Sequence, residues 1–184
     1  MRFPLPNILT IMRVGAIPFV VACFYWPSPW ASCVEVSLFL LACLTDFFDG
    51  YLARQRAQVS EFGRTFDPIA DKLLISAILL MLAGTHVLSR FALIPAAVIL
   101  CREVLVSGLR EFLSHRATAL PVMRCAQWKT VAQMSSISLL LFSRACPEWK
   151  VIPILGEIGL WIAALFTIVT GAQYFREAFS LMRR

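Results

Sequence analysis

Long apolar segments alternate with short polar connections along most of this chain. Segments of this kind are typical of helices that cross a membrane, because a helix satisfies its own backbone hydrogen bonds in lipid. The pattern predicts such helices at about 9–26, 33–52, 69–84, 91–112, 130–142 and 151–175. A short amphipathic segment containing Phe3, Leu5 and Ile8 precedes the first. We therefore expect an all-α integral membrane fold with six transmembrane helices in a single domain, residues 1–184.

Composition supports a membrane protein. Of the 184 residues, 59% are hydrophobic, and the mean hydropathy of +0.76 excludes an ordinary soluble domain. The net charge of +6 comes from 17 Lys and Arg against 11 Asp and Glu, and we attribute it to anionic lipid and cytoplasmic loops rather than to nucleic acid. The six cysteines are scattered without the spacing of a zinc site, so we interpret them as small apolar residues.

The distribution of cations predicts the orientation. The connections expected at 27–32, 86–90 and 143–150 hold only Arg90, Arg144 and Lys150. The opposite side holds Arg2, Arg54, Arg56, Arg64, Arg110, Arg116, Arg124, Lys129, Arg176, Arg183 and Arg184. The positive-inside rule then places both termini on the cytoplasmic side. Since no transit peptide precedes the first apolar segment, we expect a bacterial cytoplasmic (inner) membrane.

Four carboxylates gather where the flanking sequence indicates membrane: Asp46, Asp49, Asp67 and Asp71. Each pair is spaced three or four residues apart, so its members share one face of a helix, and a connection at 55–66 joins the two helices. A carboxylate at the bilayer centre costs roughly 2.5–3.5 kcal/mol, so four require compensation. Divalent metal is the natural compensator, and paired metals suit phosphoryl chemistry. Ion pairs with neighbouring cations are the alternative, but they leave four converging acids unexplained.

The fixed positions read D-x2-D-G-x2-A-R-x8-G-x3-D-x3-D, which resembles the signature of the CDP-alcohol phosphotransferase family of membrane enzymes. The resemblance implies two divalent ions, magnesium first and manganese as the alternative. It implies metal ligation by Asp46, Asp49, Asp67 and Asp71, with Asp71 also acting as the catalytic base for the acceptor hydroxyl. The residues implied to bind the CDP-linked donor are Asp46, Gly50, Ala53, Arg54, Gly63 and Asp67. Taken alone, Gly50 would equally suit helix packing and Arg54 an interfacial anchor.

Further segments resemble the bacterial family members that make phosphatidylglycerophosphate: PNILTIMR at 6–13, CREVLVSGLRE at 101–111 and WKT at 128–130. This resemblance implies transfer of a phosphatidyl group from CDP-diacylglycerol to the 1-hydroxyl of glycerol 3-phosphate, and a homodimer among membrane lipids. A phosphate-bearing acceptor would need cations, and we expect Arg102, Arg110 and Lys129 to supply them. One departure is Gln127, where those enzymes carry a further lysine.

Several alternatives stay open at this point. Arg102 could pair with Glu103, and Arg110 and Lys129 could serve only the charge bias of the cytoplasmic side. Asn7, Thr10 and Arg13 could line the donor site or merely cap and anchor the first helix. The same fold could use serine, inositol phosphate or phosphatidylglycerol as the acceptor. A cation transporter that uses the Asp cluster as its ion site is the alternative from another class.

Overall fold

The computed structural model describes residues 5–26, 28–56, 61–114 and 124–182, and within these ranges it contains six α-helices and no strand. The all-α prediction is therefore confirmed for this part of the chain. The helices are α1 (Leu5–Phe24), α2 (Pro29–Arg56), α3 (Glu61–Gly84), α4 (Leu93–Ser114), α5 (Arg124–Ala145) and α6 (Val151–Met182).

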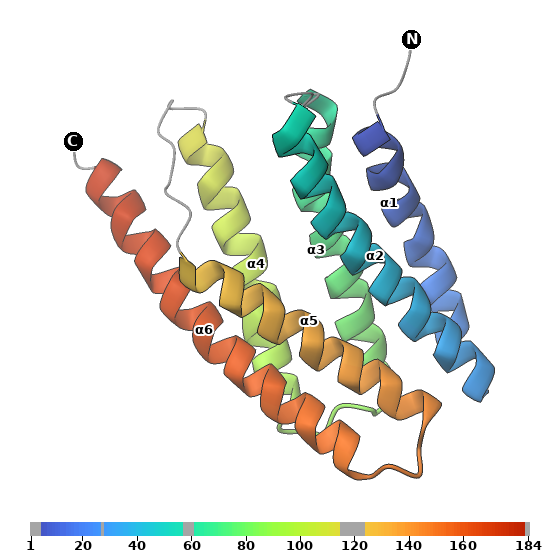
Figure 1. Ribbon diagram of the computed structural model, residues 1–184. Coiled ribbons are helices and arrows are strands. Elements are labelled where there is room, and N and C mark those ends of the chain that lie inside the picture. The colour runs from blue at the N-terminus through green and yellow to red at the C-terminus, as the bar shows by residue number, and fades with distance from the viewer. Residues whose placement is uncertain (1–4, 27, 57–60, 115–123, 183–184) are drawn as a thin grey trace.

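Successive helices run in alternating directions, so that α1 begins and α6 ends on the same side of the bundle (Figure 1). We call this the motif end, because α2 ends there and α3 begins there. The hairpin of α5 and α6 packs along its whole length, and α4 lies on α6. On the other side, α1 packs on α2 and α3, and α2 joins the two halves through α5.

Several predicted boundaries were wrong. The connection expected at 55–66 is shorter, because α2 continues to Arg56 and α3 begins at Glu61. Leu5 and Ile8 lie in the first turns of α1 rather than in a separate amphipathic segment, and Phe3 is outside the described residues. Arg144 lies in the last turn of α5 rather than in a connection.

The early start of α2 has a local cause. Ser28 caps the helix, since its Oγ accepts a hydrogen bond from the Ala31 amide at 3.2 Å. Pro29 follows as the first helical residue, where a missing N–H costs nothing and the fixed φ suits the helix. These polar and proline residues shorten the apolar pattern, so the sequence alone predicted a start four residues too late.

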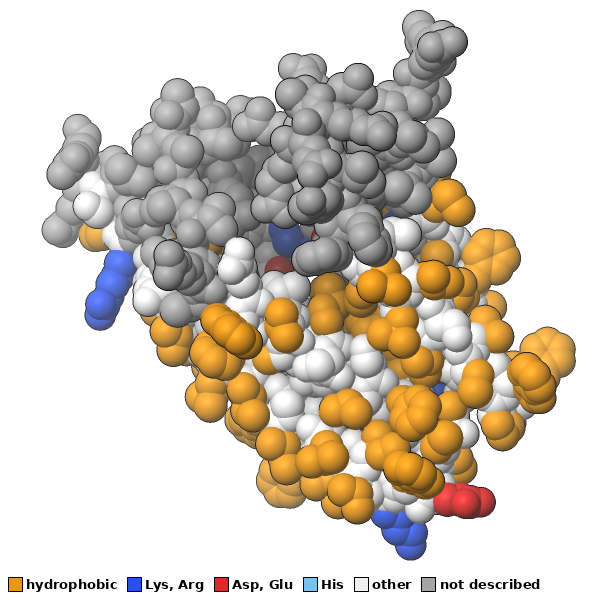
Figure 2. All heavy atoms as spheres, viewed as in Figure 1, with side chains coloured by type: hydrophobic (Ala, Val, Ile, Leu, Met, Phe, Trp, Pro, Cys, Tyr) orange, Lys and Arg blue, Asp and Glu red, His pale blue; other side chains and the backbone are white. Residues whose placement is uncertain are grey.

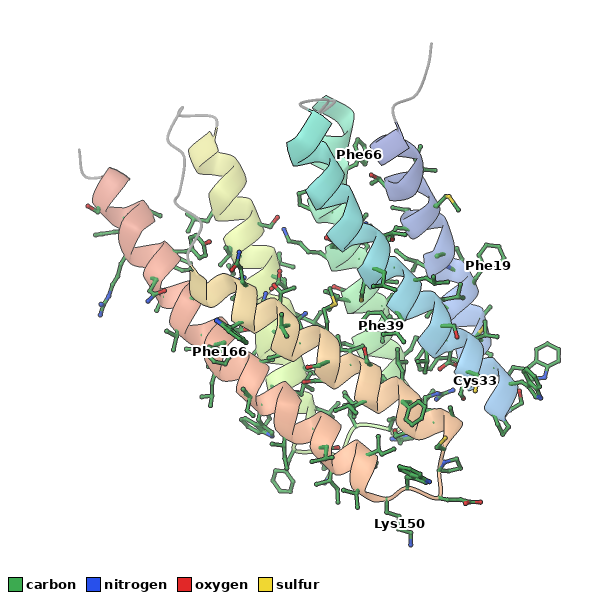
Figure 3. The ribbon with its side chains drawn as sticks, in the orientation of Figure 1. Phe19, Cys33, Phe39, Phe66, Lys150 and Phe166 are labelled. Atoms are coloured by element: carbon green, nitrogen blue, oxygen red, sulfur yellow. The ribbon has the colours of Figure 1, made fainter. Side chains whose placement is uncertain are left out.

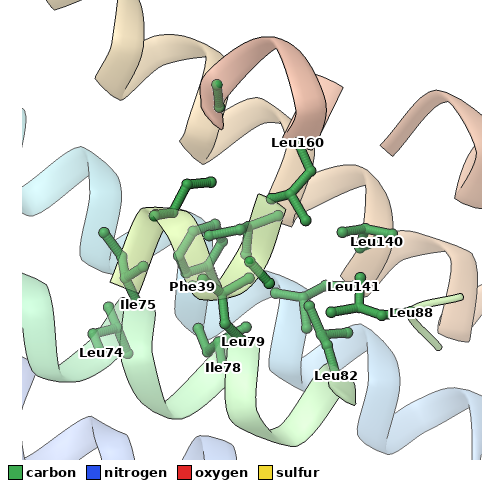
Figure 4. Close-up of a cluster of buried hydrophobic side chains, with 14 of the residues drawn as sticks. Phe39, Leu74, Ile75, Ile78, Leu79, Leu82, Leu88, Leu140, Leu141 and Leu160 are labelled. Atoms are coloured by element: carbon green, nitrogen blue, oxygen red, sulfur yellow. The ribbon is translucent and has the colours of Figure 1, made fainter. Parts of the chain in front are cut away.

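The apolar core fills the half of the bundle away from the motif end. Buried side chains repeat along α3 at Leu74, Ile78 and Leu82, which is the spacing of one helix face. They meet Phe39 of α2 and Leu141 of α5 (Figure 4). Close packing of this kind fixes the relative positions of α2, α3 and α5, and therefore the geometry at the motif end.

The outer surface is also apolar. Phe19, Leu80 and Val104 are 68–71% exposed, and hydrophobic side chains cover much of the visible face in Figure 2. In Figure 3, Phe19 points away from the bundle and Lys150 lies at the end opposite the motif end. By length and composition, one helix among the described residues could span a membrane, Val151–Ser180, with a mean hydropathy of 2.1. The apolar runs Thr10–Phe24 and Pro29–Thr45 are shorter.

Candidate active site

A carboxylate and an arginine meet between α1 and α3. Nη1 of Arg13 donates to Oδ1 of Asp71 at 2.6 Å, and the arginine side chain is almost completely buried. Thr10, one turn before Arg13, is buried as well. A buried guanidinium requires an anionic partner, and Asp71 supplies it. Of the four predicted acids, Asp71 is therefore held in place by a residue 58 positions away in the sequence.

The next residue of α3 extends this polar contact across the bundle. Lys72 Nζ donates to the hydroxyl of Ser107, so α3 is joined to α4 immediately beside Asp71. Ser107 lies four residues after Glu103, so the two share one face of α4. The Asp71 region is thereby joined to the residues that the sequence predicted as an acceptor pocket.

Two predicted acceptor cations come together on one acid. Lys129 of α5 and Arg102 of α4 both donate to Oε1 of Glu103, the latter at 3.3 Å. All three side chains are 13% exposed or less, which is unusual for charged groups. The trio has one positive charge in excess of its acid, so it favours an incoming anion such as a phosphate. The predicted ion pair of Arg102 with Glu103 is thus present together with the predicted clustering of cations.

Contacts to α6 fix the Arg102 side chain. Its Nη2 donates to Thr170 Oγ1 at 3.1 Å, and its guanidinium lies 5.7 Å from the centre of the Tyr174 ring. Gly171 allows this approach, because a Cβ there would come within 3.3 Å of Arg102 Cγ. We refer to these contacts together as the polar layer: Arg13, Asp71, Lys72, Arg102, Glu103, Ser107, Lys129 and Thr170.

The polar layer includes residues of five helices, α1 and α3 to α6. The apolar core lies farther from the motif end than this layer. Basic and acidic side chains are visible at the base of a recess in Figure 2, next to the atoms drawn in grey. Charge buried at one level of an otherwise apolar bundle costs stability, so such a layer is typical of a functional site.

Most of the predicted donor site cannot be compared side chain by side chain. Asp46, Asp49, Gly50, Ala53 and Arg54 lie in the last turns of α2, which continues beyond its predicted end at residue 52, but their side chains are outside the described part of the structure. The same holds for Gly63 and Asp67 in the first turns of α3, Arg110 in α4 and Asn7 in α1.

The predicted metal site stays a prediction for the same reason. Among the side chains that the structure describes, no three His, Cys, Asp or Glu groups lie close enough to bind one metal ion. Of the four predicted ligands, only Asp71 has a described side chain. The four predicted metal ligands are chemically suited to magnesium or manganese, since all are carboxylates, the oxygen ligands that hard divalent ions prefer. The contact that the structure describes for Asp71 is with Arg13 of α1.

An open apolar groove of about 660 Å³ lies between α1 and α2. One wall extends along α1 from Met12 to Cys23 and includes Trp26 just after the helix, and the other wall extends along α2 from Ala31 to Leu38. Gly15 and Ala16 open the groove because they present almost no side chain.

Sequence reasoning missed several members of this site. Lys72 was considered only as an ion-pair partner, and Ser107, Thr170 and Tyr174 gave no signal. Polar residues inside apolar helices could have identified the serine and the threonine, but their partners depend on tertiary packing.

Comparison with known proteins identifies the family. Residues 3–169 match the CDP-alcohol phosphatidyltransferase family. The chain belongs to this family. A protein of Rickettsia bellii named CDP-diacylglycerol–glycerol-3-phosphate 3-phosphatidyltransferase is 46% identical over 94% of this chain and 93% of its own length. Proteins of the same name from Cereibacter sphaeroides and Pectobacterium atrosepticum are 38% and 37% identical, over 100% and 97% of this chain and 99% and 96% of their own lengths.

Solved structures share the fold of this family member. The phosphatidylinositol phosphate synthase of Mycobacterium tuberculosis superposes with a TM-score of 0.65 in its apo form, over 95% of this chain and 88% of the other, at 17% identity. The complex of that enzyme with manganese and citrate has a TM-score of 0.64, over 95% and 82% of the two chains at 17% identity. Its CDP-DAG complex gives 0.63, over 95% and 86%, again at 17% identity.

Proposed function

We propose that this protein transfers the phosphatidyl group of CDP-diacylglycerol to the 1-hydroxyl of sn-glycerol 3-phosphate, forming phosphatidylglycerophosphate and CMP. The observation that supports this most directly is the polar layer, which joins Asp71 on α3 to the cations Arg102 and Lys129 on α4 and α5. An acid for the reacting hydroxyl and cations for a phosphate are what this acceptor requires. The names of the full-length relatives agree.

The donor would bind at the motif end of α2 and α3. Asp46, Asp49, Asp67 and Asp71 would hold two divalent ions, magnesium or manganese, which neutralise charge on the donor pyrophosphate when bound. Gly50, Ala53 and Gly63 would leave room for the nucleotide, and Arg54 would bind a donor phosphate through its planar fork. Asn7, Thr10 and Arg13 would line the same side from α1.

Asp71 would act on the acceptor. In this mechanism its carboxylate takes the proton of the 1-hydroxyl while the hydroxyl oxygen attacks the donor β-phosphate and CMP leaves. Arg13 keeps the carboxylate oriented through its 2.6 Å contact. Direct attack by the hydroxyl is favoured because none of the fixed positions of the motif is a Ser, Cys or His that could act as a nucleophile.

The acceptor phosphate would bind where Arg102 and Lys129 converge on Glu103, with Arg110 as a further cation. Arg102 is already positioned by Thr170 and Tyr174, so little rotamer entropy is lost when an anion binds. Gln127 occupies the position of the lysine that similar enzymes carry, and we assign phosphate binding to the remaining cations.

We further propose six spans in the bacterial cytoplasmic membrane, with both termini and the active site facing the cytoplasm. Exposed apolar side chains over the bundle support a lipid environment, and the apolar helix Val151–Ser180 supports one span directly. The homodimer implied by the family signature belongs to the same proposal.

CMP release tests the reaction. Purified protein is given CDP-diacylglycerol and magnesium with glycerol 3-phosphate, serine, inositol phosphate or phosphatidylglycerol in separate assays. We expect release only with glycerol 3-phosphate, loss of release on chelation, and restoration by magnesium or manganese. In Asp71→Asn, we expect kcat to fall by roughly 10²–10⁴-fold, the usual contribution of a general base.

Other outcomes would redirect the assignment. Release with a different acceptor would retain the metal chemistry and overturn the assignment of the phosphate pocket. Metal flux through liposomes without CMP release would instead support the cation transporter.

A further inference from the structure

Two polar groups next to the polar layer are buried without a hydrogen-bond partner among the described residues. Nε2 of Gln133 on α5 and Oγ1 of Thr167 on α6 are both inaccessible, and the residues are only 2% and 0% exposed. Leaving such a group unsatisfied costs about 1–3 kcal/mol. Buried polar groups are normally paired, so these two require an explanation.

Their positions point toward the acceptor pocket. Gln133 lies four residues after Lys129, so both share one face of α5. Thr167 lies three residues before Thr170, which binds Arg102, so these two share one face of α6. Nε of Arg102 is buried and without a partner as well. Three helices thus carry unsatisfied polar atoms within about one helical turn of Lys129 and Thr170 or on Arg102 itself.

Packing between α5 and α6 does not require polar residues at these positions. Elsewhere the two helices meet through glycine and apolar side chains, as where Gly156 lies against Leu140. Ser136 is also buried and polar, but its hydroxyl bonds to the Ala132 carbonyl of its own helix at 2.5 Å. Gln133 and Thr167 differ from it in having donors and acceptors still to satisfy.

We propose that Gln133 and Thr167 recognise the secondary hydroxyl of the acceptor, which rests on the proposed function above. With the phosphate at Arg102 and Lys129 and the primary hydroxyl directed to Asp71, the hydroxyl at C2 is the remaining polar group of glycerol 3-phosphate. Gln133 Nε2 donates a hydrogen bond to the oxygen of this hydroxyl, and Thr167 Oγ1 accepts a hydrogen bond from it. Both residues therefore determine specificity, and neither takes part in the chemical step.

The test compares two acceptors: glycerol 3-phosphate and 3-hydroxypropyl phosphate, which lacks only the secondary hydroxyl. A site built to bind a hydroxyl discriminates strongly against an analogue without it, so we expect the wild-type kcat/KM to favour glycerol 3-phosphate by roughly tenfold or more. Gln133→Met keeps the side-chain volume and loses the hydrogen-bond donor. In this variant we expect the preference to fall to about threefold or less, because kcat/KM decreases for glycerol 3-phosphate and stays the same for 3-hydroxypropyl phosphate.

Ser136→Ala is the matched control, and its preference should equal that of the wild type. If Gln133→Met does not fold, Thr167→Val gives the same test with an isosteric side chain. Equal loss toward both acceptors would mean that the residue only packs, and would overturn the inference. An active wild-type enzyme without preference would overturn it while leaving the proposed function intact, whereas absence of CMP release with either acceptor would overturn both.

Discussion

Arg13 and Asp71 form the contact on which the candidate active site depends. Nη1 of Arg13 lies 2.6 Å from Oδ1 of Asp71, and the two side chains are 1% and 29% exposed. The cation is thus enclosed between α1 and α3, while its acidic partner remains partly accessible. Because arginine stays protonated, it provides a permanent positive charge that orients the carboxylate. α1 therefore contributes to the candidate active site as well as to the apolar bundle.

Replacing Arg13 tests this role. In Arg13→Ala, we expect kcat to fall about tenfold or more, because a hydrogen bond to a charged group contributes roughly 1.5–3 kcal/mol. Arg13→Lys keeps the charge but loses the planar fork, so it should retain part of the activity. CMP release and thermal unfolding in detergent would be measured beside Arg90→Ala, an exposed arginine in a connection. Unchanged kcat in Arg13→Ala would contradict the assigned role.

The acceptor pocket makes a different kinetic prediction. Arg102→Ala and Lys129→Ala should each raise the KM for glycerol 3-phosphate by about 10–100-fold, the equivalent of one charge-assisted hydrogen bond. The KM for CDP-diacylglycerol should stay the same. Lys150→Ala is the control, since Lys150 is exposed at the opposite end of the bundle. A rise in the KM of the donor instead would assign these cations to the donor phosphates.

A further buried ion pair, far from the motif end, should affect stability alone. Arg144 donates from Nε and Nη2 to the two carboxylate oxygens of Glu35 at 3.1 and 3.3 Å, and its guanidinium lies 4.3 Å from the centre of the Phe24 ring. Glu35 is fully buried, so Glu35→Ala leaves a buried cation without its partner and should cost about 3–5 kcal/mol.

Thermal unfolding and both KM values distinguish the two roles of this pair. Glu35→Ala should lower the melting temperature and leave both KM values unchanged. The double variant Glu35→Leu with Arg144→Met should recover stability, because no uncompensated charge remains. A changed acceptor KM in Glu35→Ala would show that the pair also shapes the pocket.

The α5–α6 hairpin depends on a glycine. A Cβ at Gly159 would lie 2.4 Å from Ser136 Oγ and 3.3 Å from Ser136 Cβ, so in Gly159→Ala the Ser136 side chain must move, which should cost about 1–3 kcal/mol. Gly108→Ala is the control, because nothing lies within 4 Å of a Cβ there. Adding Ser136→Ala to Gly159→Ala should restore much of the melting temperature. Equal stability of the two alanine variants would contradict this packing.

Sequence reasoning predicted the helical class, the number of helices along the described chain and the family. Apolar periodicity and the Asp motif are local signals, so they could be read without coordinates. The helix boundaries were less accurate, because capping by Ser28 and the extension of α2 to Arg56 depend on polar residues that interrupt the apolar pattern. Roles for Arg102 and Lys129 were predicted from charge alone.

The sequence by itself determined which chemical groups this protein has: the paired acids, the small residues beside them and a surplus of cations. Tertiary structure alone decided which of these groups meet. Arg13 reaches Asp71 across 58 residues, and Arg144 reaches Glu35 across 109. Lys129 of α5 reaches Glu103 of α4 because both helices pack on α6. Such partners are set by helix packing and burial, which depend on the whole bundle at once, and no local pattern encodes them.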